Sequence, residues 1–244
     1  MKTSCLKYLL AACIGCSIMA CSQDKVVVLR RYNSGQPITE RYYPNANDTS
    51  NFMEHWFYPN GDTSAVKPFR NGQPNGTLYC YYTEGRLQRT GMVVDSLFEG
   101  TVTDYYEDGS VSTTLSLKKG VIHGKAMFFS EKGILKCVEY YNNGLRDGPF
   151  IRYYNNGHKE VELSYRNGQV TGQKLSFFEN GGLLSISHNE YGLMEGEFWQ
   201  FHENGCPRAH GWVSNNATIG TWTYWDENGN ITKVKERNGE ICMR

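Results

Sequence analysis

The stretch Gly148-Pro149-Phe150-Ile151-Arg152-Tyr153-Tyr154-Asn155-Asn156-Gly157 decides the fold of this chain. Its alternating apolar residues end at a polar pair followed by a glycine. Two residues in the right-handed region followed by a glycine with positive φ form a type I turn closed by a G1 bulge. Residues 158–165 then form a second strand, so the stretch predicts one tight β-hairpin.

The hairpin is repeated along the chain at a fixed interval of 24 residues, without an insertion. A second series of glycines lies nine residues before these turn glycines, from Gly76 to Gly220, and a third lies thirteen residues before most of them. A constant period of this length is the signature of a repeat protein, since each unit contacts only its neighbours. The turn glycines are Gly61, Gly85, Gly109, Gly133, Gly157, Gly181, Gly205 and Gly229.

These repeats predict an all-β fold, an elongated antiparallel β-meander solenoid of 24-residue β-hairpins. Each unit has an up strand, a tight turn, a down strand and a second, looser turn. We expect residues 52–244 to form the repeat domain, with strand 231–234 and a charged tail at its edge. Residues 21–51 should provide capping strands that close the other edge of the sheet.

The apolar pattern predicts which face of the sheet is packed. Aromatic residues lie four residues before every turn glycine, as in Tyr81, Tyr153 and Phe201. The assumed turn pairs this position with an aliphatic column two residues after the glycine, such as Leu87 and Leu183, so we expect this face to be packed. The opposite face should be amphiphilic and carry a candidate binding column of exposed rings at Tyr82, Tyr106, Tyr154 and Phe178.

The N-terminus has the pattern of a secretory signal. Lys2 and Lys7 precede an apolar segment that ends at residue 20 and is too short for a stop-transfer helix. Ile18-Met19-Ala20-Cys21 resembles the lipobox of bacterial lipoproteins, which implies cleavage after residue 20 and lipidation of Cys21. We therefore expect a protein of the cell envelope, lipid-anchored to a membrane, with the outer membrane favoured and the domain facing the periplasm or the cell surface. Plain secretion is the alternative.

The repeat unit resembles the MORN-repeat variant of many bacterial proteins, some of which are described as antitoxin-like. The closest correspondence is at Tyr153-Tyr154-Asn155-Asn156-Gly157 and Phe177-Phe178-Glu179-Asn180-Gly181, with Asn143-Gly144 and Asn167-Gly168 opening their units. The resemblance covers residues 52–240 and implies an elongated, twisted antiparallel sheet that acts as a scaffold. It brings no catalytic residues.

No motif of a known catalytic or cofactor site is present, so we expect a protein that is not an enzyme and has no cofactor or metal. His202, Cys206 and His210 come closest to a metal site, but a tetrahedral site needs more ligands than two adjacent ones. The spacing of Cys80, Cys137, Cys206 and Cys242 matches no disulfide framework, and we expect mostly free thiols.

Charge limits the choice of partner. Lys and Arg together number 25, as do Asp and Glu, so the chain lacks the basic excess that binds nucleic acid. The sequence favours a non-catalytic envelope scaffold for protein interactions. Binding of glycans by the tyrosine column and an antitoxin or immunity-like role are the two alternatives.

Overall fold

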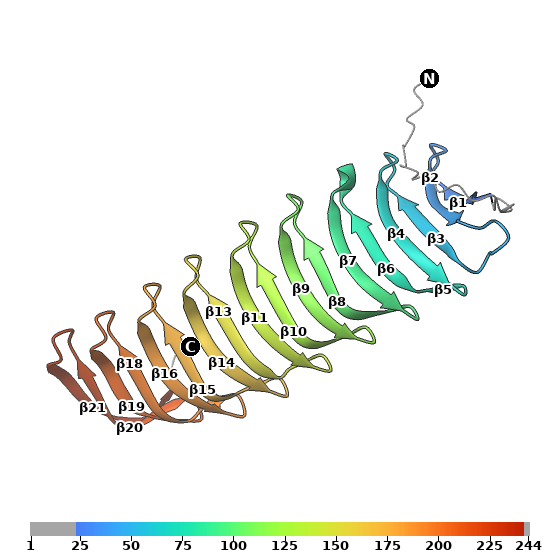
Figure 1. Ribbon diagram of the computed structural model, residues 1–244. Coiled ribbons are helices and arrows are strands. Elements are labelled where there is room, and N and C mark those ends of the chain that lie inside the picture. The colour runs from blue at the N-terminus through green and yellow to red at the C-terminus, as the bar shows by residue number, and fades with distance from the viewer. Residues whose placement is uncertain (1–22, 242–244) are drawn as a thin grey trace, which may run out of the picture.

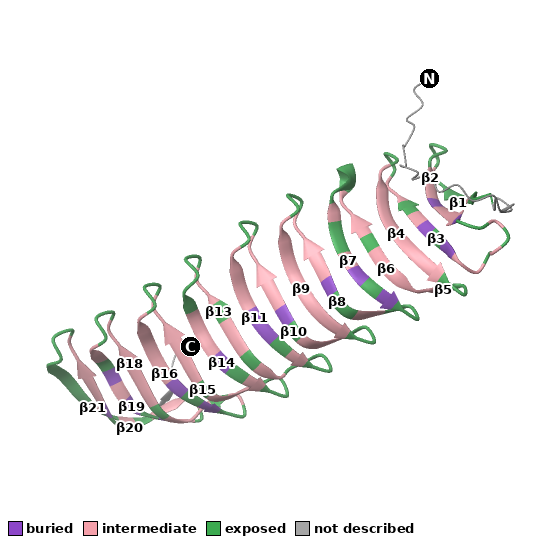
Figure 2. Ribbon diagram, in the orientation of Figure 1, coloured by how far each residue is buried: buried purple, intermediate pink, exposed green. Residues whose placement is uncertain are grey.

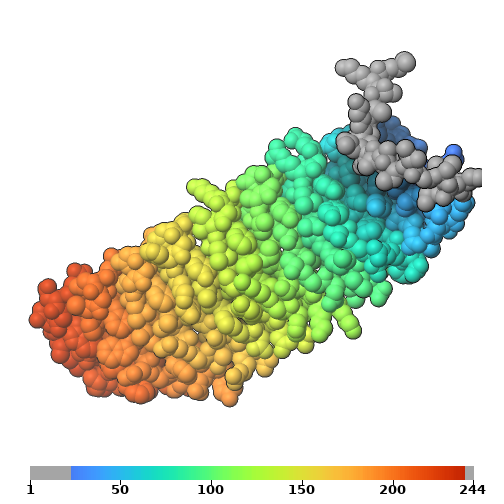
Figure 3. All heavy atoms as spheres, viewed as in Figure 1, coloured from blue at the N-terminus to red at the C-terminus, as the bar shows by residue number. Residues whose placement is uncertain are grey.

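The computed structural model describes residues 23–241 of the 244-residue chain. The expected signal peptide at residues 1–20, the lipid site Cys21 and the thiol of Cys242 lie outside this range. The described chain is one open antiparallel sheet, in which successive hairpins follow one another along a single axis (Figure 1). The predicted all-β meander is confirmed. The space-filling view shows one elongated body, coloured in chain order from end to end (Figure 3).

Strands follow each other in the sheet in the order of the sequence, and each pairs with the strands before and after it. Bulges divide three strands into two parts each, namely β5 and β6, β12 and β13, and β17 and β18. One hairpin tip forms the short 3-10 turn η1 (Thr83–Gly85). Within residues 23–241, no helix has the length and apolar character needed to cross a membrane. The strands are β1 (Lys25–Arg31), β2 (Pro37–Tyr43), β3 (Phe52–Phe57), β4 (Thr63–Arg70), β5 (Gln73–Pro74), β6 (Gly76–Tyr81), β7 (Leu87–Val94), β8 (Leu97–Tyr105), β9 (Val111–Lys118), β10 (Val121–Phe129), β11 (Leu135–Asn142), β12 (Leu145–Arg146), β13 (Gly148–Tyr153), β14 (Lys159–Arg166), β15 (Gln169–Phe177), β16 (Leu183–Glu190), β17 (Leu193–Met194), β18 (Gly196–Phe201), β19 (Pro207–Ser214), β20 (Ala217–Trp225) and β21 (Ile231–Ile241).

The tight turns have the geometry that the glycine series predicts. Gly157 has φ of 87°, and its N–H donates to the carbonyl of Tyr154, while the N–H of Tyr154 donates to the carbonyl of His158. The other seven turn glycines also have positive φ and make the same bond to the residue three before them. As a result Tyr153 pairs with Lys159, and the aromatic position faces the second residue after the glycine in every unit.

The second turn of each unit is tighter than the sequence suggests. Asn143 and Gly144 have φ of 48° and 85°, and positive φ at both central residues defines a two-residue type I′ turn. The N–H of Gly144 is left free by the hairpin and donates to the carbonyl of Ile122 in the preceding unit, at 2.9 Å. The expectation of a looser turn is therefore wrong, because the turn has only two central residues. The hydrogen bond of Gly144 also links neighbouring units.

Both ends of the sheet continue the repeat. Strands β1 and β2 meet at Gly35, which has φ of 88° and makes the same turn bonds as the later glycines. At the other end, β21 pairs with β20 from Ile231 to Ile241. The predicted edge strand at 231–234 is thus too short, since residues 235–237 belong to the strand instead of forming a charged tail.

The two faces of the sheet differ in burial, and the prediction of the packed face is wrong. Apart from Val138, all buried side chains in the described range lie on the face that carries Val102, Ala126 and Leu163, here called the crowded face. The other face, called the open face, carries the aromatic column with Tyr153, which is only half-buried. Buried residues form a band across successive strands (Figure 2). The strands are curved (Figure 1).

Candidate binding surface

The tyrosine column runs along the tips of the tight hairpins and fastens each unit to the next. The hydroxyl of Tyr82 donates to the carbonyl of Tyr105 at 2.8 Å, and the hydroxyl of Tyr154 donates to the carbonyl of Phe177 at 2.8 Å. Tyr106 makes the same bond over 23 residues. The rings are half-buried, so the expectation of an exposed column on the opposite face is wrong. These tyrosines are the first residues of the tight turns, and their hydroxyls reach the next unit along the sheet.

This contact extends beyond the predicted residues. Tyr32 and Tyr58 donate to the carbonyls of Phe57 and Tyr81 in the same way. In the unit of Gly205, His202 takes the place of tyrosine, with Nε2 at 3.0 Å from the carbonyl of Trp225. Phe178 has the same position and half-buried ring but no hydroxyl. Burial raises the pKa of the Tyr154 hydroxyl from its ordinary value. The column therefore has a structural role along most of the sheet.

Two hollows lie beside this column. Tyr82 and Tyr105 line a hollow of about 300 Å³ together with Cys80, Arg89 and Asp104. Tyr106 lines another of about 520 Å³ with residues of the next hairpin tip. The hydroxyls of Tyr82 and Tyr106 are engaged in hydrogen bonds at the unit boundaries, so they are not free to bind a ligand in these hollows.

The structure separates the three residues of the metal-site hypothesis. His202 lies against Trp225, while His210 stacks on the indole of Trp199. Cys206 contacts His202 through the main chain, since its carbonyl accepts the N–H of His202. No group of three His, Cys, Asp or Glu side chains in the described part of the chain could hold a metal ion. Cys80, Cys137 and Cys206 are free thiols.

The crowded face holds paired charges between its apolar residues. Arg89 contacts Asp104, and Arg152 contacts Glu160 at 2.8 Å. Glu139 is buried and accepts two hydrogen bonds from Arg146, whose pKa these bonds raise. Because these charged side chains form ion pairs with one another within the sheet, they are not available to bind a partner.

The open face exposes apolar side chains over most of its length. Leu97, Val121, Leu145 and Leu193 each directly follow a type I′ turn and form an apolar ridge along that edge, 38–54% exposed. Leu97 lies against Gly120, and Val121 lies against Gly144 of the next turn. The neighbouring strands add further exposed residues of the same face, namely Met53, Tyr79, Met92, Val94, Tyr140 and Trp212. Contiguous exposed apolar surface of this kind is typical of interaction sites.

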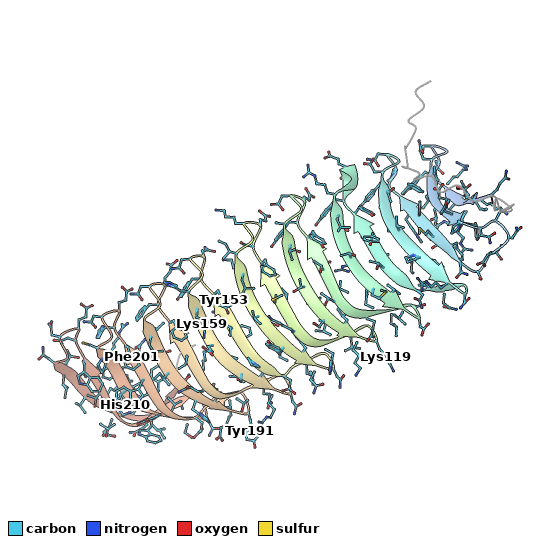
Figure 4. All side chains as sticks on the ribbon, viewed as in Figure 1. Lys119, Tyr153, Lys159, Tyr191, Phe201 and His210 are labelled. Carbon is cyan, nitrogen blue, oxygen red and sulfur yellow. The ribbon has the colours of Figure 1, made fainter. Side chains whose placement is uncertain are left out.

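An aromatic cluster lies at the C-terminal end of the open face. The rings of Trp199 and His210 stack with centroids 3.9 Å apart and an angle of 21°, and Glu197 lies 3.2 Å from His210 Nε2. Trp225 and Phe201 lie nearly parallel to Trp199, at 6.4 and 6.2 Å. Figure 4 labels Phe201 and His210 near this end of the sheet. Large flat side chains that lose little entropy on binding are frequent at interface centres.

Sequence reasoning missed the ridge, although its signal is visible in the repeat. The position twelve residues before the turn glycine reads Gln73, Leu97, Val121, Leu145, Gln169, Leu193, Ala217 when the units are aligned. The ridge was missed because the glycines and aromatic residues are the most regular positions of each unit. Within a single unit, one apolar residue after the type I′ turn does not by itself indicate a surface that continues across units.

Comparison with known proteins gives a short family match. Residues 146–167 match the family model for the MORN repeat variant. No curated protein matches the chain at a significant level. Similar solved structures include a TcdB2-TccC3-Cdc42 complex, at 11% identity and a TM-score of 0.23, covering 85% of this chain and 15% of that chain. The pore of the Photorhabdus luminescens Tc holotoxin matches at 10% identity and a TM-score of 0.20, covering 88% of this chain and 15% of that chain. The chain thus spans about 15% of the length of these proteins.

Proposed function

We propose, from the premise that the chain is a MORN-repeat-variant protein, that it is a non-catalytic scaffold of the cell envelope, held on a membrane by a lipid at Cys21. Its open face binds a protein partner. The observation that carries the proposal is the apolar ridge, because exposed leucine and valine side chains recur there in successive units.

The difference between the two faces supports this choice. A monomeric sheet is expected to bury its apolar side chains and leave its charged ones in water. Here the crowded face contains four arginine–carboxylate pairs, whereas Leu145 is 54% exposed on the open face. A partner that covers the ridge would remove this apolar area from water, at about 25 cal/mol per Å².

Photo-crosslinking in intact cells tests the partner surface. A photoreactive residue at Leu97, Val121 or Leu145 should give the same crosslinked partner, because these three positions follow one another in successive units. Control positions at Glu107 and Glu179 are exposed at the opposite hairpin tips and should give none. Leu145→Glu should abolish the crosslink from Val121 without lowering the melting temperature, since the site is on the surface. Crosslinks from the tips alone, or none from the ridge, would contradict the proposal.

The anchor has a separate test. Cys21→Ser should release the protein from the membrane fraction, because a lipid chain contributes about 0.8 kcal/mol for each buried methylene group. The same substitution at Cys16 is the control and should leave the protein on the membrane. Equal membrane association of the Cys21→Ser variant and the parent would refute the lipid anchor.

Structural use of the tyrosine hydroxyls weakens the case for glycan binding by that column. An antitoxin or immunity-like role differs from the scaffold in its partner. It would be favoured if the crosslinked partner were a small protein that is toxic when the chain is deleted.

A further inference from the structure

Tyr191 is an outlier in the repeat. The first residue of the type I′ turn is Asn71, Asp95, Lys119, Asn143, Asn167 or Asn215 in the other units, and all have positive φ. Asn and Asp tolerate this left-handed conformation, whereas a bulky ring at φ of 49° is rare. Tyr191 is also 82% exposed, so packing does not explain its presence. An unfavourable backbone position with an exposed ring points to a function.

A pocket of about 360 Å³ lies beside Tyr191 on the open face. Nε2 of His188 is 3.7 Å from Oε1 of Glu190, and both side chains are more than half exposed. Figure 4 labels Tyr191 on the same long edge of the sheet as Lys119, the edge of the type I′ turns. The pocket lining includes Arg166, Gln169, Gly172, His188, Glu190 and Tyr191.

The pocket lies where one regular feature of the repeat changes. Gln169 occupies the position of the apolar ridge, where Leu145 precedes it and Leu193 follows it. Gly172 has φ of 72°, and no atom lies within 4 Å of the place where its Cβ would be. The ridge is therefore interrupted at Gln169 by a polar pocket.

The hydrogen-bonding groups of the pocket lining indicate which class of ligand would bind. Arg166 offers N–H donors, Glu190 offers carboxylate acceptors, and Gln169 and His188 offer both kinds. One guanidinium and one carboxylate leave the site with no net charge to favour an ion. Vicinal hydroxyl groups each donate and accept hydrogen bonds, so a mixed lining of this kind suits them. An exposed aromatic ring with a polar edge is a stacking surface for the apolar face of a pyranose ring.

We propose that this pocket binds a neutral saccharide, with a pyranose ring stacked on Tyr191 and its hydroxyl groups bound by Arg166, Gln169 and Glu190. The site is distinct from the apolar ridge, and its failure would leave the proposed protein-binding function untouched. It also differs from the tyrosine column, since Tyr191 is at the opposite edge of the sheet (Figure 4).

Binding is measured by calorimetry with the full chain in a detergent that contains no sugar. The probes are maltohexaose, cellohexaose and chitohexaose, with 3′-sialyllactose as the anionic comparison. We expect at least one neutral hexasaccharide to bind. Tyr191→Asn restores the usual turn residue and should weaken that binding at least tenfold, while the melting temperature stays the same or rises. Gln169→Leu restores the ridge residue and should also weaken binding.

Asn143→Tyr is the matched control, since it places a tyrosine in the equivalent turn without the pocket and should not change the affinity. Three results would overturn the proposal: binding of no neutral probe, binding of sialyllactose alone, or an affinity that both Tyr191→Asn and Gln169→Leu leave unchanged. If Tyr191→Asn changes the conformation of the turn, Gln169→Leu still tests the pocket, because Gln169 lies outside that turn.

Discussion

The indole of Trp222 lies so close to the backbone of Gly211 on the crowded face that a Cβ at this position would overlap the ring. Gly211 does not have positive φ, so it is a glycine for reasons of space and not of turn geometry. Trp222 is 5% exposed and packs with Ala209 and Val213 in the main buried cluster. The absence of a side chain at Gly211 thus makes room for the largest side chain of that cluster.

Gly211→Ala should destabilise the protein by about 1–3 kcal/mol, the usual cost of overpacking a core. Chemical denaturation measures the change. Trp222→Phe also destabilises, but the double variant should lose less than the sum of the two, because a smaller ring leaves room for the methyl group. Strict additivity would show that Gly211 and Trp222 do not depend on each other.

Tyr154→Phe should cost about 0.5–1.5 kcal/mol, because it leaves the carbonyl of Phe177 without its donor. The opposite substitution, which adds a hydroxyl to the column, can be made at Phe178. Phe178→Tyr places a hydroxyl where the carbonyl of Phe201 is the equivalent acceptor, and it should stabilise the protein. Both variants are compared with the parent by thermal and denaturant unfolding. A destabilising Phe178→Tyr would contradict the proposed equivalence of the units.

Stability at low pH should depend on carboxylates in the turns. Hydrogen bonds from Ser50 and Asn51 lower the pKa of Asp48 from 3.8 to about 2. A carboxyl whose pKa is lower in the folded state stabilises fully above its unfolded pKa, and this contribution is lost as the pH falls from 3.8 through about 2. Bonds from Ser110 and Asn230 lower the pKa of Asp108 and Asp226 in the same direction.

Between pH 4 and pH 2, the parent should therefore lose more stability than Asp48→Asn, since an amide does not titrate. The measurement is the urea midpoint of both proteins at several pH values. Parallel curves for the two proteins would refute the role of Asp48.

Cys137 should be unreactive in the folded protein. Burial raises the pKa of its thiol to about 12, and Glu139 contributes because its carboxylate repels the thiolate and accepts the thiol proton. At pH 8 only about one thiol in ten thousand would be ionised, and the thiolate is the reactive form. Mass spectrometry after brief iodoacetamide treatment should find Cys137 unmodified. Glu139→Gln should speed its alkylation, and rapid labelling of the parent would contradict this assignment.

The local pattern of the sequence was sufficient for the turns and the pairing. A glycine after two polar residues fixes the tight turn through backbone conformation alone, and the turn then pairs Tyr153 with Lys159. The 24-residue spacing makes every unit do the same, so the meander and its direction of growth could be predicted. The lipobox at Cys21 remains a prediction from sequence.

The candidate sites could not be derived in the same way, because they depend on contacts between units. The hydroxyl of Tyr154 finds its acceptor 23 residues away, and the pocket beside Tyr191 needs Arg166 from another strand. Within one hairpin, neither partner is present. The signals of these sites that the sequence does contain are the apolar column of the ridge and the position of Tyr191 in an otherwise Asn-rich turn column.

The sequence by itself determined the β-hairpin, its period and its register, since these follow from φ preferences and from neighbours within one unit. Only the tertiary structure decided which face is crowded. Both faces carry apolar residues at alternate positions, for example Ile151 on the open face and Phe150 on the crowded face. Which of the two sets is buried depends on packing against the side chains of neighbouring units, and a single unit does not contain those neighbours.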